Sequence, residues 1–333
     1  MTTIDDVARD AGCSTSTVSY VLSGKRPISA ATRLRVERSI RDLGFRPHAG
    51  ARALASSRTN VLALMAPLRV GVDVNVIMQF VAGVVTSART FGHDVLLLTD
   101  DDGAGLERVA DGSMVDALIM MDIEDDDPRV PVLVRLRQPA VLIGVPRDPA
   151  GLSCVDLDFE AAGRLAVRHL AHLGHTSIAL IGSPQAVLDR HTAYAERMHH
   201  GFTSETAALG LTAIVVPCES SPAGAVAAVD TVLERMPELT GLVVHNESAL
   251  AAVLATLRER GRAVPGDISV VAVCPPDVAV GQSVPCTSVD IPAHALGRVA
   301  VEMAIARVEG EQAAETRLLT PNLTERQSTA VVR

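Results

Sequence analysis

Side chains that can both donate and accept hydrogen bonds gather in one short stretch near the N-terminus, from Ser14 to Tyr20. Groups of this kind contact phosphate oxygens and base edges in protein–DNA complexes. Within and just after the stretch, Val18, Val21 and Leu22 follow the spacing of one helix face, which predicts an apolar inner side. The outer side would present Thr15, Ser16, Ser19 and Tyr20. The pattern therefore predicts a helix whose exposed face can bind a polar surface such as DNA.

Capping residues predict two further helices around this one. Thr3 followed by Asp6 resembles a capping box, and Gly12 would end the first helix. Ser29 is a suitable N-cap for a third helix, which would end at Gly44. Three short helices with a tight turn between the first two predict a helix-turn-helix unit, whose second helix enters the major groove. The alternative is a helical cap on an enzyme, with its arginines on a solvated face.

The charge distribution favours the DNA interpretation. The first sixty residues contain ten Lys and Arg against five Asp and Glu, a net charge of +5, while the whole chain carries −9. The remainder therefore carries −14. A basic segment can neutralise phosphates and release counterions, whereas an acidic body is repelled by them.

The sequence resembles the LacI/GalR family of bacterial transcription repressors. The segments that carry the resemblance at the N-terminal end are Thr3 to Leu22, Arg46-Pro47, Ala51 to Leu54 and Arg58 to Asn60. It continues through Gly163 to Gly182, Val264 to Val271 and Leu323 to Ala330. The resemblance implies an N-terminal all-α helix-turn-helix head with a hinge helix. It also implies an α/β two-lobed periplasmic-binding-protein-like body of doubly wound parallel sheets.

The resemblance also assigns DNA-contacting positions in the head. Base edges would be contacted by Thr15, Ser16 and Tyr20; many family members have Arg at the Tyr20 position, and purine-type repressors have His. A Tyr hydroxyl makes a single hydrogen bond to a base, whereas an Arg guanidinium can donate two to guanine. Arg26 therefore becomes the candidate for a direct guanine contact. The candidate phosphate anchors are Ser14, Thr17, Ser19 and Lys25. For Thr17 and Ser19, plain helix surface is the alternative.

The hinge is expected between His48 and Ser57. An isolated helix this short is marginal in water, so it should fold only on DNA beside its twin from a second subunit. By resemblance Leu54 is the wedge between central base pairs, with Ala51 and Arg52 in the minor groove. A plain linker is the alternative.

The remainder of the chain alternates between apolar strands and helical segments, as in doubly wound sheets. Predicted strands are 60–65, 93–98, 117–121, 140–144, 177–181, 213–216, 241–244 and 269–273. The predicted domains are a head over 1–47, a hinge over 48–60 and a body over 61–333. Within the body, one lobe would comprise about 61–158 and 290–318, and the other about 159–289 and 319–333. Ligands of such folds bind beyond the carboxyl ends of the strands.

The expected effector cleft departs from the pattern of sugar-binding family members. Where those members commonly have a strand-end Asp, this chain has Gly144 in one segment and Cys274 in another. Asn246 is the best-preserved polar position, and Arg197 lies one residue from the place of the family's effector arginine. We therefore expect an effector that is less hydroxylated or more anionic than a sugar, held by Asn246 and one of Arg190 or Arg197, with Cys274 as a further candidate contact. Whether an effector is used at all, and whether it would induce or co-repress, stays open.

Other clusters of reactive residues have plainer interpretations. The triplet His169, His172 and His175 could mimic metal ligands, but imidazoles are also favourable near a helix C-terminus. The runs 100–102 and 124–127 lack the interleaved spacing of a calcium loop and are interpreted as solvated loop acids. Neither a complete dinucleotide fingerprint nor a Gly-x-Ser-x-Gly motif occurs. We expect no metal, no cofactor and no catalytic centre.

The complete prediction is a cytosolic, homodimeric repressor that binds a pseudo-palindromic operator and responds to a small molecule. The 333-residue chain has no apolar run of 18 residues, and Asp5, Asp6 and Arg9 stand where a secretory signal would be apolar. Five widely spaced cysteines do not suggest a disulfide framework. The alternative is a sugar-binding-like solute-binding protein without a DNA role, against which the basic N-terminal segment argues. By resemblance, the helix carrying Ile77, Phe80, Val81 and Val84 is a candidate dimer contact.

Overall fold

The head is a bundle of three short helices in a computed structural model that describes residues 2–23, 26–45, 58–69, 71–99, 103–112, 114–310 and 313–332. The helices are α1 (Ile4–Asp10), α2 (Thr15–Ser23) and α3 (Ala30–Asp42). The side chain of Thr3 accepts a hydrogen bond from the Asp6 N–H, and the Asp6 carboxylate accepts one from the Thr3 N–H, which confirms the capping box. Ser29 caps α3 as predicted. Local capping thus fixes where these helices begin.

The core of the head is small and differs from expectation at one position. Val7, Val18 and Val36 are fully buried at its centre. Leu22 was expected in this core, but it is 36% exposed because it lies at the edge of the α2 stripe, away from the residues that α1 and α3 bury. The predicted DNA contacts Lys25, Ala51, Arg52 and Leu54 lie outside the described residues.

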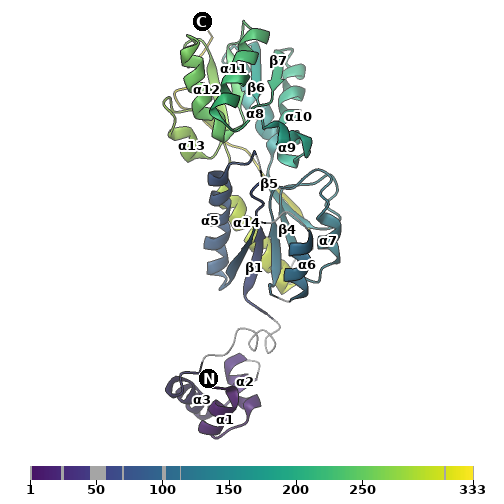
Figure 1. The fold of residues 1–333 in the computed structure, drawn as a ribbon, viewed down its shortest axis with the longest axis vertical. Coiled ribbons are helices and arrows are strands. Elements are labelled where there is room, and N and C mark those ends of the chain that lie inside the picture. Colours follow the sequence, from purple (N-terminus) through teal and green to yellow (C-terminus); the bar gives the residue numbers. More distant parts are fainter. Residues whose placement is uncertain are drawn as a thin grey trace.

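The body consists of two lobes, each built on one sheet of mainly parallel strands (Figure 1). The N-lobe sheet has the order β11-β5-β4-β3-β1-β2. Its strands are β1 (Val61–Met65), β2 (Asp94–Leu98), β3 (Ala117–Met120), β4 (Ala140–Ile143), β5 (Ser153–Leu157) and β11 (Thr316–Leu319). Its helices are α5 (Val74–Thr90), α6 (Gly103–Asp111), α7 (Val130–Arg135) and α14 (Ala293–Glu309). All its strand pairs are parallel, and β3 and β4 are completely buried, as expected for strands covered on both faces.

The C-lobe repeats this arrangement, with the strand order β12-β10-β9-β8-β6-β7. Its strands are β6 (Ser177–Ile181), β7 (Thr212–Val216), β8 (Gly241–Val244), β9 (Ser269–Cys274), β10 (Thr287–Asp290) and the antiparallel β12 (Leu323–Thr324). Its helices are α8 (Phe159–His172), α9 (Gln185–Asp189), α10 (Ala193–Ala208), α11 (Pro222–Arg235), α12 (Glu247–Glu259) and α13 (Pro276–Val280). The eight predicted strands are all present, within one residue at their ends. Doubly wound sheets are therefore confirmed.

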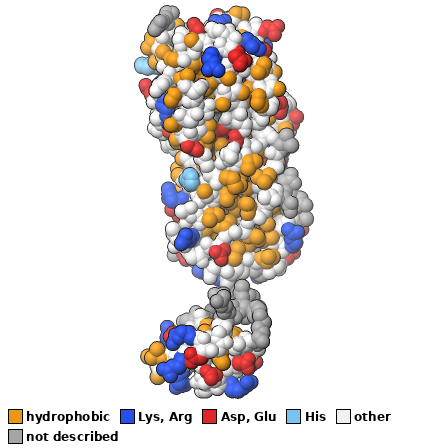
Figure 2. All heavy atoms as spheres, turned by 60° about the vertical axis from the view of Figure 1, so that its left-hand side comes forward, with side chains coloured by type: hydrophobic (Ala, Val, Ile, Leu, Met, Phe, Trp, Pro, Cys, Tyr) orange, Lys and Arg blue, Asp and Glu red, His pale blue; other side chains and the backbone are white. Residues whose placement is uncertain are grey.

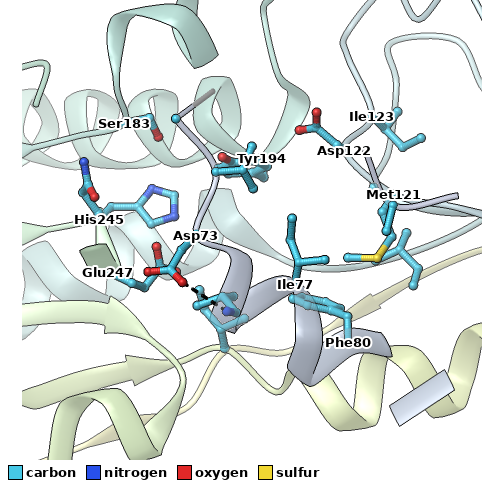
Figure 3. Close-up of a pocket in the computed structure, with 18 of the residues that line it drawn as sticks. Asp73, Ile77, Phe80, Met121, Asp122, Ile123, Ser183, Tyr194, His245 and Glu247 are labelled. Carbon is cyan, nitrogen blue, oxygen red and sulfur yellow. Dashed lines mark hydrogen bonds between the residues drawn. The ribbon is translucent and has the colours of Figure 1, made fainter. Parts of the chain in front are cut away.

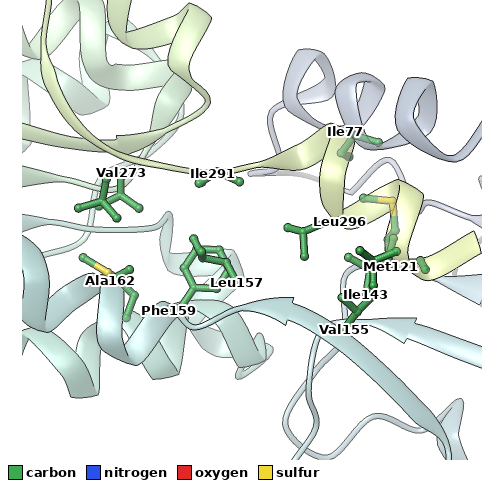
Figure 4. Packing of buried hydrophobic residues seen from close by; sticks show 14 of the residues in the cluster. Ile77, Met121, Ile143, Val155, Leu157, Phe159, Ala162, Val273, Ile291 and Leu296 are labelled. Carbon is green, nitrogen blue, oxygen red and sulfur yellow. The ribbon is translucent and has the colours of Figure 1, made fainter. Parts of the chain in front are cut away.

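The chain crosses between the lobes after β5, after β10 and after β11. One hydrophobic cluster continues through the first two crossings, where Leu157, Phe159 and Ile291 are at most 5% exposed (Figure 4). Since interiors are close-packed, this continuous core limits how the lobes can move relative to each other.

Each lobe also contains two helices that cross at glycines. In the C-lobe, a Cβ on Gly201 of α10 would lie 2.1 Å from the Glu160 carbonyl oxygen, and one on Gly163 of α8 would lie 2.7 Å from opposing backbone. In the N-lobe, Gly83 of α5 and Gly297 of α14 approach the facing helix just as closely, at 2.6 and 2.7 Å. The helix pairs can pack this tightly only where a side chain is missing.

We expect Gly201→Ala to destabilise the C-lobe by about 1–3 kcal/mol or more, because the added methyl group would overlap backbone that cannot move independently. Thermal unfolding followed by circular dichroism measures this as a lower melting temperature. Gly182→Ala is the matched control, since a Cβ there meets nothing closer than 4.0 Å. Equal melting temperatures for the two variants would show that the helix crossing is not close-packed.

Candidate functional site

A cavity lies between the lobes at the carboxyl ends of their strands. It has an empty volume of about 950 Å³, including space open to solvent. The N-lobe contributes the start of α5 and the residues that follow β3 and β4, while the C-lobe contributes the residues that follow β6 and β8 (Figure 3). This is the position at which doubly wound folds bind ligands.

One wall of the cleft is aromatic. The rings of Phe159, Tyr194 and His245 contact one another, with centroids 5.5 to 5.6 Å apart. Burial raises the pKa of the Tyr194 phenol and lowers the pKa of His245 to about 4, so both are uncharged at neutral pH. The wall can therefore stack against a ligand and offer it neutral hydrogen-bonding groups.

The cleft also contains four carboxyl groups, which the sequence did not indicate. Asp73 and Glu247 come from the N-terminal ends of α5 and α12, while Asp122 is the second residue after β3 and Asp156 lies in β5. From Gly144 and Cys274 we expected a cleft with few carboxylates to accept hydrogen bonds from ligand hydroxyls. That expectation is wrong for the cleft as a whole, because other segments supply carboxylates. No sequence pattern links these four positions; only the fold brings them together.

The two predicted arginines stand behind the lining carboxylates instead of lining the cavity. Arg197 approaches Asp156 to 3.2 Å, and Arg190 approaches Asp122 to 3.6 Å. Asp122 also pairs with Arg69 at 3.1 Å. Burial raises the pKa of Asp156 to about 7, and the Arg197 charge acts in the opposite direction. Both arginines therefore neutralise the protein's own acids, which leaves them poorly placed to hold an anionic ligand.

The other two predicted effector residues have different surroundings. Asn246 lines the cavity, but its side chain caps α12 by accepting from the Ala249 N–H and donates to the Cys218 carbonyl at 2.7 Å. Cys274 is 1% exposed at the end of β9, packs in the C-lobe core and is not among the cavity-lining residues. The structure thus brings Asn246 alone of the four predicted residues to the cavity wall.

Several polar contacts join the lobes across the cleft. The Ser248 hydroxyl donates to the Asp73 carboxylate at 2.5 Å, and the Gln79 amide donates to Asp277 at 3.0 Å. At the opposite rim, the Asp125 N–H donates to the His191 carbonyl at 2.8 Å. The lobes are therefore linked on both sides of the cavity.

A buried ion pair supports the strand end that carries Asp122. Asp127 was interpreted as a solvated loop acid, but it is 5% exposed and accepts two hydrogen bonds from the Arg129 guanidinium, at 2.9 and 2.7 Å. Arg129 also donates to the Asp122 carbonyl at 2.7 Å. Asp122 has a positive φ of 55°, a strained conformation that Asp tolerates better than most residues. Arg129 thus holds the backbone that places the Asp122 carboxylate.

On the head, Tyr20 and Arg26 form one unit. The Arg26 guanidinium carbon lies 5.2 Å from the centroid of the Tyr20 ring, a cation–π contact. Ser16 and Arg26 are exposed, whereas Thr15, Ser19 and Tyr20 are half-buried. The Ser14 hydroxyl caps α2 by accepting from the Thr17 N–H, and the two hydroxyls are bonded at 2.9 Å. All these predicted contacts belong to α2 or to its immediate flanks.

Two histidines of the triplet have a structural role. His169 contacts the Thr329 hydroxyl at 3.2 Å, and His175 contacts the Ala330 carbonyl at 3.1 Å, so both fasten the C-terminal segment. In the described part of the chain, no three His, Cys, Asp or Glu side chains are grouped as metal ligands would be. Within the same part of the chain, no helix has the length and apolar character that a membrane span requires.

Comparisons with known proteins agree with this architecture. Residues 3–48 match the bacterial regulatory proteins of the lacI family, and residues 167–329 match the periplasmic binding protein-like domain. The HTH-type transcriptional regulator CelR of Thermobifida fusca is 31% identical, over 95% of each chain. GalR of Escherichia coli strain K12 is 30% identical, over 98% of this chain and 96% of GalR. The chain therefore belongs to the lacI family of bacterial regulatory proteins.

Solved structures extend the comparison to three dimensions. A CelR–cellobiose complex superposes with a TM-score of 0.70 at 28% identity, over 98% of this chain and all of that one. A Lac repressor dimer bound to operator and an anti-inducer superposes with a TM-score of 0.85 over 99% of each chain; at 23% identity it attests the fold alone. The relatives are transcriptional regulators and not enzymes, and this chain is a DNA-binding transcriptional regulator.

We expect Arg129→Met to destabilise the protein by about 3–5 kcal/mol, because it leaves the buried Asp127 charge without a partner. Denaturant unfolding measures the loss. Adding Asp127→Asn to the variant should recover part of it, since the unpaired charge is then removed. The control is Arg147→Met, which breaks ion pairs with Asp125 and Asp126 made by a side chain that is 66% exposed, and should leave unfolding nearly unchanged. Similar unfolding curves for Arg129→Met and Arg147→Met would contradict the supporting role of Arg129.

Proposed function

We propose that this protein is a cytoplasmic, homodimeric repressor that binds a pseudo-palindromic operator and adjusts its DNA affinity to a small molecule held between the lobes. The observation that carries the proposal is the combination in one chain of a capped helix-turn-helix head and a two-lobed body with a cleft. The proposed units are the head at 1–47, the hinge at 48–60 and the body at 61–333. Catalysis forms no part of this function.

In the proposed DNA complex, the face of α2 reads the major groove. Thr15, Ser16 and Tyr20 would contact base edges, and Arg26 would contact guanine. The cation–π contact supports this assignment of Arg26, because stacking on Tyr20 restricts a long side chain before DNA arrives. Arg26 is also exposed, so it can reach beyond the ring.

The remaining head and hinge residues would hold the DNA backbone and the minor groove. Ser14, Thr17, Ser19 and Lys25 are the proposed phosphate anchors, and a hydroxyl at the start of α2 is well placed because helix N-termini attract phosphate. Ala51, Arg52 and Leu54 would enter the minor groove, with Leu54 as the wedge.

The effector would bind in the cleft, as the CelR–cellobiose complex suggests for a relative. Asn246 retains a place in the proposed site because it lines the cavity. Arg190 and Arg197 would act indirectly, since each is paired with a lining carboxylate. A ligand that touches both lobes can bias their relative position, and through the hinge the spacing of the two heads.

Dimerisation would use the exposed face of α5. Of the residues first suggested, Ile77 is 6% exposed and Val84 is fully buried, so both face the core and cannot be contacts. The same helix instead exposes Val74, Met78 and Val85 by 39 to 48%. Figure 2 shows hydrophobic side chains gathered on the side of the N-lobe from which α5 projects. A patch of this kind on a soluble protein marks an interaction surface.

The DNA-reading role is tested by selecting bound fragments from a random library at physiological salt. The full chain should recover a palindromic motif. Arg26→Ala should lose preference at one base pair of each half-site, about 1–3 kcal/mol of discrimination. Tyr20→Ala should relax the same base pair in part, because it removes the ring that positions Arg26. If Arg26→Ala weakens binding to every DNA sequence equally, Arg26 contacts phosphate and not a base. Failure of the full chain to enrich any motif would refute the proposed function.

The assembly is tested by Val85→Asp, which places a charge in the exposed apolar face of α5. At micromolar concentration, sedimentation should show a shift from dimer towards monomer, with at least a tenfold loss of operator affinity because the second head is no longer held in place. Leu209→Asp, at an exposed apolar position in the other lobe, is the control and should remain dimeric. A dimeric Val85→Asp variant would place the interface elsewhere.

A further inference from the structure

The cleft is predominantly apolar. Val76, Phe80, Met121, Ile143 and Ile291 contribute aliphatic or aromatic surface to its lining, in addition to the aromatic wall. Its serines are engaged with the protein: Ser220 contacts the Gly71 carbonyl at 3.4 Å, and Ser248 donates to Asp73. A buried ligand hydroxyl without a partner costs about 1–3 kcal/mol. The cleft is therefore better suited to an apolar body than to a densely hydroxylated one.

The ionisable groups of the cleft are all acidic except for one neutral histidine. Asp73, Asp122, Asp156 and Glu247 line it, and no Lys or Arg among the described residues does. Burying an uncompensated carboxylate is costly, so each one requires a counterpart. An anionic ligand would add to this excess of negative charge.

Three of the four carboxylates have counterparts within the protein. Arginines pair with Asp122 and Asp156. Asp73 caps α5 by accepting from two backbone N–H groups, and it also accepts from Ser248. Glu247 differs, since no other described residue donates a hydrogen bond to its carboxylate or forms an ion pair with it. Burial, together with the nearby Asp73 charge, raises the pKa of Glu247 to about 7.

His245 is a second unpartnered group at the same end of the cleft. It is 5% exposed, and among the described residues neither ring nitrogen has a hydrogen-bond partner. Its imidazole points into the cavity beside Tyr194, with Asp73 and Glu247 nearby (Figure 3). Because the ring is neutral, one nitrogen can accept a hydrogen bond from a ligand.

We propose that the effector is an amphipathic cation, with a protonated amine attached to an apolar or aromatic body. The ammonium lies between Glu247 and Asp73 and donates to His245, while the body packs against Phe80 and the aromatic wall, where cation–π attraction adds to burial. Since Asp73 belongs to the N-lobe and Glu247 to the C-lobe, the cation also removes a repulsion between the lobes. This assignment rests on the proposed function, in which the cleft holds the effector.

The test is calorimetric titration of the full chain at pH 8 with 4-phenylbutylamine and with 4-phenyl-1-butanol, which has the same skeleton without the charge. The amine should bind at least about tenfold more tightly, the equivalent of one favourable buried charge contact. Glu247→Gln should weaken amine binding about tenfold and leave alcohol binding unchanged. Glu309→Gln, exposed at the end of α14, is the control and should behave as the unaltered chain.

Three results would overturn the proposal: equal affinity for amine and alcohol, saturable binding of cellobiose with no binding of the amine, or no saturable binding of either phenyl compound. Selection of bound DNA fragments with the same protein preparation tests the proposed DNA-binding function independently of the ligand proposal. A chain that enriches a palindrome but does not bind the amine remains a regulator with another effector. A chain that binds the amine and enriches no DNA keeps the ligand assignment and loses the DNA role.

Discussion

The arrangement of the body depends on ion pairs that cross between its lobes. Arg190 and Arg197 of the C-lobe approach Asp122 and Asp156 of the N-lobe, and all four side chains are largely buried. Removing such a pair from water costs nearly as much as the attraction returns, so these contacts add specificity more than net stability. Opening the cleft would rehydrate both partners. These ion pairs thus help to define how the lobes sit relative to each other, and a ligand that favours one arrangement of the lobes acts on the same contacts.

Much of the fold follows from local sequence signals. The caps of α1 and α3 are single side chains bonded to nearby backbone, so sequence alone locates them. The predicted strands are short apolar runs that parallel sheets bury on both faces. Leu22 was wrongly placed in the core because helix periodicity predicts which side of a helix faces inward. It does not predict how much of that side the neighbouring helices cover. The family resemblance supplied the two-lobed architecture, which periodicity could not.

Strands and site residues that depend on distant partners could not be predicted. Strand β10 reads Thr-Ser-Val-Asp, and its Thr287 and Ser288 can be buried because Ser328 and Arg326, about forty positions away, bond to them. The cleft carboxylates likewise lie on four separate segments. Asn246 looked like a ligand contact because its type and position matched the family. Its hydrogen bonds show that capping α12 explains the residue type equally well.

The glycine-crossed helix pairs have a consequence for synthesis of the chain. In the N-lobe, α5 packs against α14, and the sheet edge at β5 is completed by β11, which ends at Leu319. The first lobe to leave the ribosome therefore lacks a covering helix and an edge strand until the chain has been made as far as Leu319. The C-lobe obtains its own crossed pair, α8 and α10, from consecutive sequence. Because non-local contacts form late, the lobe that is translated first cannot be completed before most of the other lobe has been made, and the C-lobe in turn acquires its edge strand only with β12.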